Sequence, residues 1–192
     1  HALGVLSTRP ARPFSAERDG IHIGEGAALL LIERRGDGPA YVASVGESSD
    51  AHSMSAPHPE GQGAAAAIRE ALSKARLSPE DIDYVNAHGT GTEQNDQAES
   101  RAILSTLPAH VPVSSTKGLT GHTLGACGAI EAIFSALTIQ HGQLPPSAGA
   151  LPLDPALGLN IVGGPTRKQV KAVLSNAFAF GGSNTGLVLA AP

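Results

Sequence analysis

Two polar blocks, each placed directly after a short apolar run, constrain the fold of this 192-residue chain most strongly. The first block is NAHGTGT (86–92), which follows the run 82–85, and the second is SSTKGLTGH (114–122), which follows the run 111–113. A helical pattern comes after each block. This order indicates neighbouring strands of an α/β sheet, at whose carboxyl ends open sheets of this class build their sites.

The remaining pattern extends this α/β reading along the chain. Gly63 opens a predicted helix in which Ile68, Ala71, Leu72 and Ala75 follow the i, i+3, i+4, i+7 spacing. Strands and helices then alternate, before three strands follow without helices; the predicted ranges are strand 82–87, helix 96–107, strand 111–114, helix 121–141 and strands 159–162, 171–178 and 184–189. Earlier strands are expected at 27–32, as a buried run, and at 41–45. We therefore predict a mixed five-stranded sheet with helices packed on it.

Composition excludes several classes of function. The net charge is −4 and the chain has no basic run, which argues against nucleic-acid binding. No apolar run approaches the ~18 residues of a membrane span. The first residues lack the features of a signal peptide, and a single cysteine agrees with a reducing compartment, so we expect a cytoplasmic protein.

Two histidines and a lysine in the polar blocks suggest stabilisation of a developing negative oxygen, because a neutral imidazole can donate a hydrogen bond. His88 is flanked by glycines and threonines, which let a ligand approach closely; a purely structural histidine is the alternative. His122 lies where a loop becomes a helix, so the helix dipole is expected to disfavour its protonated form. Its alternative is a helix cap. Alone, Lys117 would be read as a solvated lysine.

For other reactive side chains, the sequence favours a structural role over a catalytic or metal-binding one. Glu131 is a lone carboxylate in an apolar, small-residue helix, and Lys117 is its expected partner; an exposed helix face is the alternative. Cys127 is the only thiol, yet its small neighbours favour packing over nucleophilic catalysis. His52 and His58 share a loop with two acids, but without tight ligand spacing we predict no metal site.

Four ordered blocks make the chain resemble the elongation-type β-ketoacyl-ACP synthases, the condensing enzymes of the thiolase superfamily. The blocks are 17–27, 86–92, 114–125 and NAFAFGGSN (176–184). Such synthases are about twice as long and carry their nucleophilic cysteine in the N-terminal half, so the chain looks like the C-terminal half only. The resemblance divides the chain into residues 1–35, the end of the N-terminal thiolase half, and residues 36–192, the C-terminal thiolase-like domain. Finer details around 49–61 and 95–96 resemble the branch that makes aryl polyenes and other polyunsaturated chains.

The resemblance assigns roles residue by residue. It makes His88 and His122 the two catalytic histidines and Lys117 the lysine that orders the site. It also gives the backbone N–H of Phe180 half of an oxyanion hole. The remaining implied roles are substrate binding by Thr90, Thr92, Phe178 and Gly181, with support from Glu131 and Asp96. One departure is Ala179, where such enzymes usually have glycine, and a stiffer loop is expected there.

The implied reaction is decarboxylative Claisen condensation of an acyl thioester with malonyl-ACP, in fatty acid or polyketide-type elongation. The implied partners are an acyl carrier protein, the absent N-terminal half and a second subunit in a homodimer or heterodimer. No cofactor is implied beyond the phosphopantetheine that the carrier protein brings. Without the nucleophile, the chain alone is expected to be inactive. The alternative is a non-catalytic partner subunit like the chain-length factors, which usually lose the residues retained here.

Overall fold

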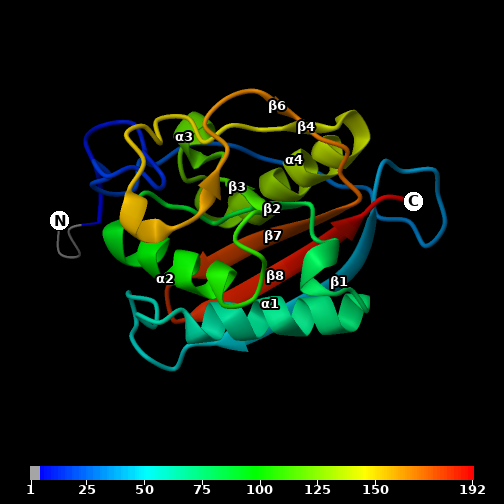
Figure 1. Ribbon diagram of the computed structural model, residues 1–192, viewed down its shortest axis with the longest axis horizontal. Helices are drawn as coiled ribbons and strands as arrows, with labels where there is room; N and C mark the ends of the chain where they lie inside the picture. The colour runs from blue at the N-terminus through cyan, green and yellow to red at the C-terminus, as the bar shows by residue number, and fades with distance from the viewer. Residues whose placement is uncertain (1–4) are drawn as a thin grey trace.

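A six-stranded mixed sheet forms the centre of the protein, whose computed structural model describes residues 5–192 (Figure 1). The strand order is β1-β8-β7-β2-β3-β5. These strands are β1 (Tyr41–Ser49), β2 (Tyr84–Asn86), β3 (Pro112–Ser114), β5 (Asn160–Ile161), β7 (Ala172–Ala179) and β8 (Ser183–Ala190). A separate antiparallel pair consists of β4 (Gln143–Leu144) and β6 (Thr166–Arg167).

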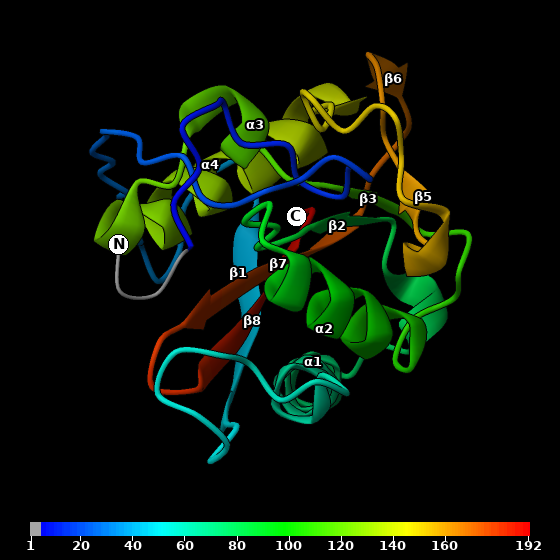
Figure 2. The same ribbon diagram turned by 90° about the vertical axis from the view of Figure 1, so that its left-hand side faces the viewer.

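Helices cover both faces of the sheet, as Figure 2 shows with α1 and α2 on one face and α3 and α4 on the other. Their bounds are α1 (Gln62–Ala75), α2 (Glu93–Leu104), α3 (Lys117–Thr120) and α4 (Cys127–His141). Three short 3-10 turns are η1 (Pro79–Asp81), η2 (Leu124–Ala126) and η3 (Pro155–Leu157). The apolar stripe of α1 packs on β1 and β8 as predicted. Gly46 of β1 permits that approach, because a Cβ there would lie 2.1 Å from the Ala67 carbonyl oxygen.

Strand direction changes at β7, the centre of the sheet. The predicted strands 171–178 and 184–189 form an antiparallel hairpin as β7 and β8, and Gly181 and Gly182 in its turn adopt φ values of 86° and 80°. On its other edge, β7 pairs in parallel with β2, which pairs in parallel with β3. The carboxyl ends of β2 and β3 therefore lie side by side, and the two polar blocks meet there.

The predicted α/β class with a mixed sheet is confirmed, but the predicted number of five strands is wrong. The strand expected at 41–45, which is β1, joins the five strands expected after residue 80 in one sheet, and β5, within the predicted range 159–162, is a two-residue edge that pairs in parallel with β3. The predicted helix over 121–141 is also wrong in its first turns, because α4 begins only at Cys127. Gly121 and Leu124 have left-handed φ values of 69° and 52°, which a continuous α-helix does not contain.

Residues 27–32 were predicted to form a buried strand, but they are not buried and do not form a strand. The segment pairs with no strand among the described residues, and Leu29, Leu31 and Ile32 are 97%, 86% and 75% exposed. An apolar run becomes a buried strand only where partner strands and a covering layer exist. Within residues 5–192, neither reaches this run.

Residues 5–35 contact the rest of the protein through isolated bridges, hydrogen bonds, ion pairs of Arg18 with Asp96 and Asp154, and one buried ring. Phe14 is fully buried in the same apolar core as Ile68 and Val85. Isolated bridges join Ser15 to Leu153 and Ile23 to His122. The division of the chain at residues 35 and 36 stays a prediction.

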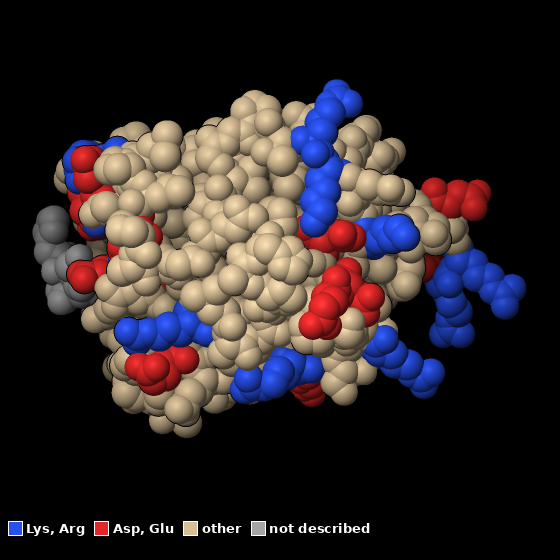
Figure 3. All heavy atoms as spheres, viewed as in Figure 1, with Lys and Arg blue, Asp and Glu red and all other residues tan. Residues whose placement is uncertain are grey.

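The surface view agrees with a modest, mixed charge. On the face shown in Figure 3, acidic and basic side chains lie close to one another around an uncharged centre. Across the described part of the chain, every helix is too short or too polar to cross a membrane.

Candidate active site

His88 follows the central strand β2 and has only 5% of its surface exposed. The chain turns directly after it, because Gly89 has a φ of 41° and a Cβ there would lie 2.5 Å from the Ser115 Cβ. The N–H groups of His88 and Gly89 donate to the two carboxylate oxygens of Glu99, at 2.8 and 2.7 Å. Glu99 of α2 thus fixes the backbone that carries the imidazole.

Lys117 begins helix α3 and is 1% exposed. Its ammonium forms a buried ion pair with Glu131 of α4, as the sequence predicted, and lies 3.4 Å from Nδ1 of His88. An ammonium group has protons to donate and no lone pair to accept with, so Nδ1 is the acceptor. The His88 imidazole therefore carries its own proton on Nε2.

His122 is held in the same tautomer by a different donor. Its backbone N–H donates to the His22 carbonyl oxygen at 2.7 Å, and the Leu124 N–H donates to its Nδ1 at 3.1 Å. The left-handed backbone of Leu124 is part of this turn. The centroids of the His88 and His122 rings lie 5.3 Å apart, with the ring planes at 85°. Two imidazoles with Nε2 protons thus stand next to each other.

Both imidazoles are neutral at neutral pH. Burial, followed by the Lys117 charge and the neighbouring His122, lowers the pKa of His88 well below its usual range. Burial and then the Lys117 charge lower the pKa of His122 to about 4. The sequence predicted a neutral His122 from a helix dipole, but α4 begins five residues later and burial is the larger cause. The pair is a set of hydrogen-bond donors and not a pair of cations.

Glu99 is the one buried acid of this site that the sequence analysis missed. It is 1% exposed, and burial raises its pKa to about 7 although His88, Gly89 and Asn176 all donate to it. A signal was present in the sequence. Asp96 and Glu99 are three residues apart on one helix, which places them on the same face, where Ile103 lies one turn further on.

Asp96 supports the loop below the histidines without touching them. It is fully buried, and its oxygens accept from the backbone N–H groups of Phe14 at 2.8 Å and Gly91 at 3.2 Å. The Asn95 side-chain amide donates to it at 3.1 Å. Asp96 therefore joins the first segment and the glycine loop to α2.

Thr90 and Thr92 lie on the loop between β2 and α2. Their hydroxyl oxygens are 2.9 Å apart, and the Thr92 hydroxyl also accepts from the Asn95 N–H at 3.3 Å as the N-cap of α2. Both residues line the large cavity described below. Their predicted contact with a phosphopantetheine arm stays a prediction.

The β7–β8 turn brings the two phenylalanines to the site. The Phe178 ring lies 5.5 Å from that of His88, while Phe180 at the tip is 59% exposed. The Gly181 N–H donates to the Met54 carbonyl oxygen at 2.8 Å, which joins this turn to the long loop before α1. Ala179 still belongs to β7, so alanine fits the extended backbone at that point.

A cavity of about 530 Å³ connects these elements. Of the predicted site residues, those that line it are His88, Thr90, Thr92, His122, Phe178 and Phe180. The buried Lys117, Glu131 and Asp96 stand behind its wall, and Gly181 is not among the lining residues. Nonpolar lining predominates, as expected for an acyl chain or another flexible apolar ligand.

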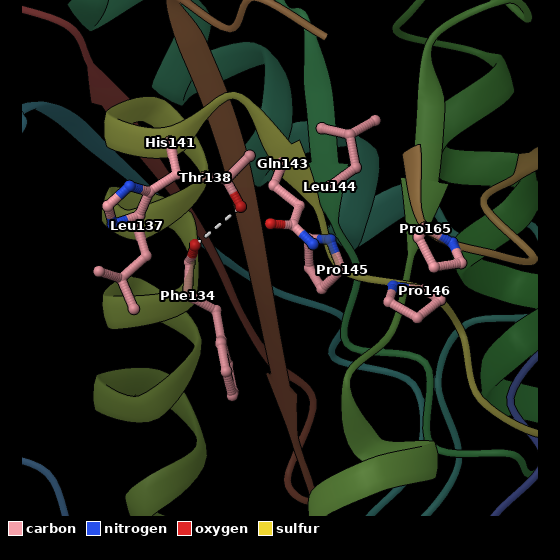
Figure 4. A pocket seen from close by; sticks show the side chains of 9 residues that line it. All are labelled: Phe134, Leu137, Thr138, His141, Gln143, Leu144, Pro145, Pro146 and Pro165. Atoms are coloured by element: carbon pink, nitrogen blue, oxygen red, sulfur yellow. Dashed lines mark hydrogen bonds between the residues drawn. The ribbon is translucent and has the colours of Figure 1, made fainter. Parts of the chain in front are cut away.

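A smaller cavity of about 210 Å³ lies at the far end of α4, between its last turn and three prolines (Figure 4). His141 is its only titratable lining residue, and the Thr138 hydroxyl donates to the Phe134 carbonyl oxygen beside it. Nothing in this cavity resembles the arrangement around His88.

Cys127 is buried, as predicted, but it contacts the site. Its Sγ lies 3.2 Å from Nδ1 of His122 and 3.3 Å from Oγ1 of Thr123. An imidazole with a pKa of about 4 is too weak a base to hold the proton of a thiol at neutral pH. This environment favours a thiol that donates a hydrogen bond over a catalytic thiolate.

The histidine-containing loop at 50–61 uses its polar groups internally. Asp50 accepts from the His58 N–H at 3.0 Å, and Nδ1 of His58 accepts from the Glu60 N–H at 3.2 Å. Throughout residues 5–192, no three or more metal-binding side chains gather in one place.

The mixed sheet with helices on both faces is that of a thiolase-fold domain. The chain belongs to the beta-ketoacyl synthase family, since residues 39–150 match the family described as "Beta-ketoacyl synthase, C-terminal domain". This confirms the resemblance found in the sequence.

Individual relatives agree with this assignment. The chain is 42% identical over 190 residues to 3-oxoacyl-[acyl-carrier-protein] synthase 2 of Staphylococcus aureus, covering 92% of this chain and 47% of that protein. The ishigamide ketosynthase/chain length factor superposes with a TM-score of 0.90 at 34% identity, over 100% of this chain and 49% of that one. A ketosynthase (ApeO) of Xenorhabdus doucetiae, solved with its chain length factor, gives 0.84 at 43% identity, over 100% and 48%. The chain thus spans about half the length of the relatives it matches.

Proposed function

We propose that this chain supplies the malonyl-decarboxylating side of a β-ketoacyl-ACP synthase, an acyltransferase that joins an acyl thioester to malonyl-ACP by decarboxylative Claisen condensation. One observation carries this proposal: two neutral imidazoles, each with its proton on Nε2, stand 5.3 Å apart on the wall of one apolar cavity. Two neighbouring hydrogen-bond donors can stabilise the oxygen of a developing thioester enolate.

In the proposed reaction, the malonyl group loses CO₂ and the electron pair of the broken C–C bond moves into the thioester. The negative charge collects on the thioester oxygen, where the Nε2–H groups of His88 and His122 donate to it. The enolate carbon then attacks the acyl thioester, and the acyl group leaves its thiol. Lys117 keeps His88 in the donor tautomer, while Glu131 balances the lysine charge. The Phe180 N–H is proposed to bind the oxygen of the acyl thioester.

The acyl group is proposed to rest on a cysteine outside this chain. Cys127 is the only thiol in the sequence, and its contacts make it a donor to His122. Because the chain covers about half of its relatives, we propose that the other half supplies the nucleophile and covers the exposed run 29–32.

The proposed partner is an acyl carrier protein, whose phosphopantetheine would enter past Thr90 and Thr92, with no further cofactor. A dimer, a cytoplasmic location and the aryl-polyene branch belong to the same proposal. It draws on the carrier protein named for the staphylococcal relative and on the ketosynthase–chain length factor complex among the structural neighbours.

Separate assays of the two half-reactions test the proposal in the complete protein. His88→Ala and His122→Ala should each slow malonyl-ACP decarboxylation about a hundredfold or more, because each removes one oxyanion donor. Transfer of the first acyl group should slow much less. His110→Ala, at an exposed histidine, is the matched control. Folded variants that decarboxylate at the control's rate would contradict the proposal.

The 192-residue chain provides a second test. Incubated alone with acyl-ACP and malonyl-ACP, it should form no ketoacyl product, since removing one member of a catalytic unit removes nearly the whole effect. Turnover near ~10 per second would contradict the missing-nucleophile argument.

The same assays address the alternative, a non-catalytic subunit like a chain length factor. Under that alternative, the complete protein folds but has no decarboxylase activity. Burying Lys117, Glu131 and Glu99 is costly, which favours a site retained for chemistry.

A further inference from the structure

The turn that carries His122 contains a side-chain contact that the proposed reaction has not used. Nδ1 of His122 has two neighbours, the Leu124 N–H at 3.1 Å and the Cys127 Sγ at 3.2 Å. Cys127 is the first residue of α4 and 5% exposed, so its position is fixed by the helix. A thiol within this distance of a nitrogen lone pair makes a weak hydrogen bond.

The direction of this hydrogen bond follows from the neighbouring groups. Nδ1 already accepts from a backbone N–H, so it carries no proton, and the thiol can only donate to it, sharing the one lone pair of Nδ1 with that N–H. The Thr123 hydroxyl, 3.3 Å from Sγ, can donate to the sulfur in turn. The contacts form a chain from Thr123 through Cys127 to His122, with every proton directed toward Nδ1.

We infer that Cys127 is a positioning residue for His122, which lines the cavity: its S–H donates to Nδ1 and helps to keep the imidazole proton on Nε2. The consequence for decarboxylation rests on the proposed function, but the hydrogen bond does not. A second donor at Nδ1 also restrains rotation of the ring, because a flipped imidazole would lose both partners.

Nuclear magnetic resonance of the ¹⁵N-labelled chain tests this inference without any substrate. The protonation of His122 is followed by pH titration in the wild type and in Cys127→Ala and Cys127→Ser. Loss of a donor to the unprotonated nitrogen favours the imidazolium form, so Cys127→Ala should raise the proton affinity of His122 about two- to tenfold. Cys127→Ser retains a donor and should stay within about twofold of the wild type. The other groups that act on His122 are Lys117 and His88, and they are unchanged in both variants.

Thr138→Val is the matched control, because it removes a buried hydroxyl from the same helix without a contact to His122. It should leave the His122 titration unchanged. The inference is overturned if folded Cys127→Ala titrates like the wild type, or if Cys127→Ser behaves like Cys127→Ala. If Cys127→Ala does not fold, the wild-type spectrum and Cys127→Ser decide: a His122 protonated on Nδ1 at neutral pH overturns it. A failed activity assay with an intact Nδ1 hydrogen bond would count against the proposed function alone.

Discussion

In most proteins charged side chains are exposed and large apolar side chains are buried. The histidine site and the segment 24–40 depart from this pattern in opposite ways. The site buries charged residues, with Lys117 and Glu99 at 1% exposure and Glu131 at 2%. The segment exposes leucines, with Leu29 at 97% and Leu31 at 86%. The buried charges have partners within the chain, whereas the leucines have none among the described residues. Available partners, and not the polarity of a side chain alone, decide what this chain buries.

The largest expected effect comes from breaking the buried ion pair. Lys117→Met leaves the Glu131 carboxylate without its partner inside the protein, which should lower the free energy of unfolding by about 3–5 kcal/mol. Urea denaturation of the chain measures this change. The double variant Lys117→Met/Glu131→Leu removes both charges and should recover most of the loss.

An exposed lysine provides the control for that experiment. Lys74 pairs with Glu70 at 3.0 Å on the surface of α1, and Lys74→Met should leave stability unchanged within error. Equal losses for Lys117→Met and Lys74→Met would show that the buried pair is not distinct from a surface pair.

An intermediate effect is expected in the pH dependence of stability. His122 has a folded pKa of about 4 against an ordinary value of 6.5, so between these values the unfolded chain binds a proton that the folded chain does not. Its contribution to stability is therefore present above pH 6.5 and is lost as the pH falls toward 4. His122→Gln cannot titrate and should lose less stability than the wild type over this window. Denaturation midpoints at several pH values measure the difference.

Glu99 changes the pH dependence of stability in the opposite direction. The effect of His122 is therefore measured as the difference between the wild type and His122→Gln. The pKa of Glu99 is raised to about 7, so its contribution is lost as the pH rises from its ordinary 4.5 toward 7. Both variants retain Glu99, and the difference between them isolates His122. Parallel pH profiles for the wild type and His122→Gln would show that the imidazole does not resist protonation in the folded state.

The smallest effect is expected in the exposed segment. Leu31→Ser should change the unfolding free energy of the chain by less than about 0.5 kcal/mol, as at other exposed positions. Leu174→Ala, in the core strand β7, should cost about 2–5 kcal/mol. If a further half covers this run, Leu31→Ser should destabilise the complete protein more than the chain. Equal effects in both would argue against that covering.

The same contrast separates what the sequence could predict from what it could not. Alternating strands and helices, the α1 stripe and the final two strands depend on local spacing, and these predictions were correct. The run 27–32 was mispredicted because periodicity reports apolar character but not whether a partner strand is present. The start of α4 was misplaced because Leu124 adopts a left-handed φ, in a turn where its N–H donates to His122, and a leucine does not predict that conformation.

For the site, the lone carboxylate in an apolar helix correctly indicated the Lys117–Glu131 pair. Glu99 was missed although its spacing from Asp96 and Ile103 places it on the buried face of α2, because that spacing does not show that the face is turned toward His88. The contact between Cys127 and His122 also depends on how the 122–127 turn folds back. Pairwise geometry of this kind requires the three-dimensional structure.

The strand order carries a consequence for synthesis of the chain on the ribosome. β7 and β8, the last strands of the sheet to emerge, stand between β1 (Tyr41–Ser49) and β2 (Tyr84–Asn86), which are made much earlier than β7 (Ala172–Ala179). Until the hairpin arrives, β1 has no neighbour and β2 lacks one, so neither edge of the future sheet is protected. Contacts between residues so distant in sequence form slowly and leave unpaired strands open to other chains. The central part of the sheet can therefore form only after the β7–β8 hairpin has been made.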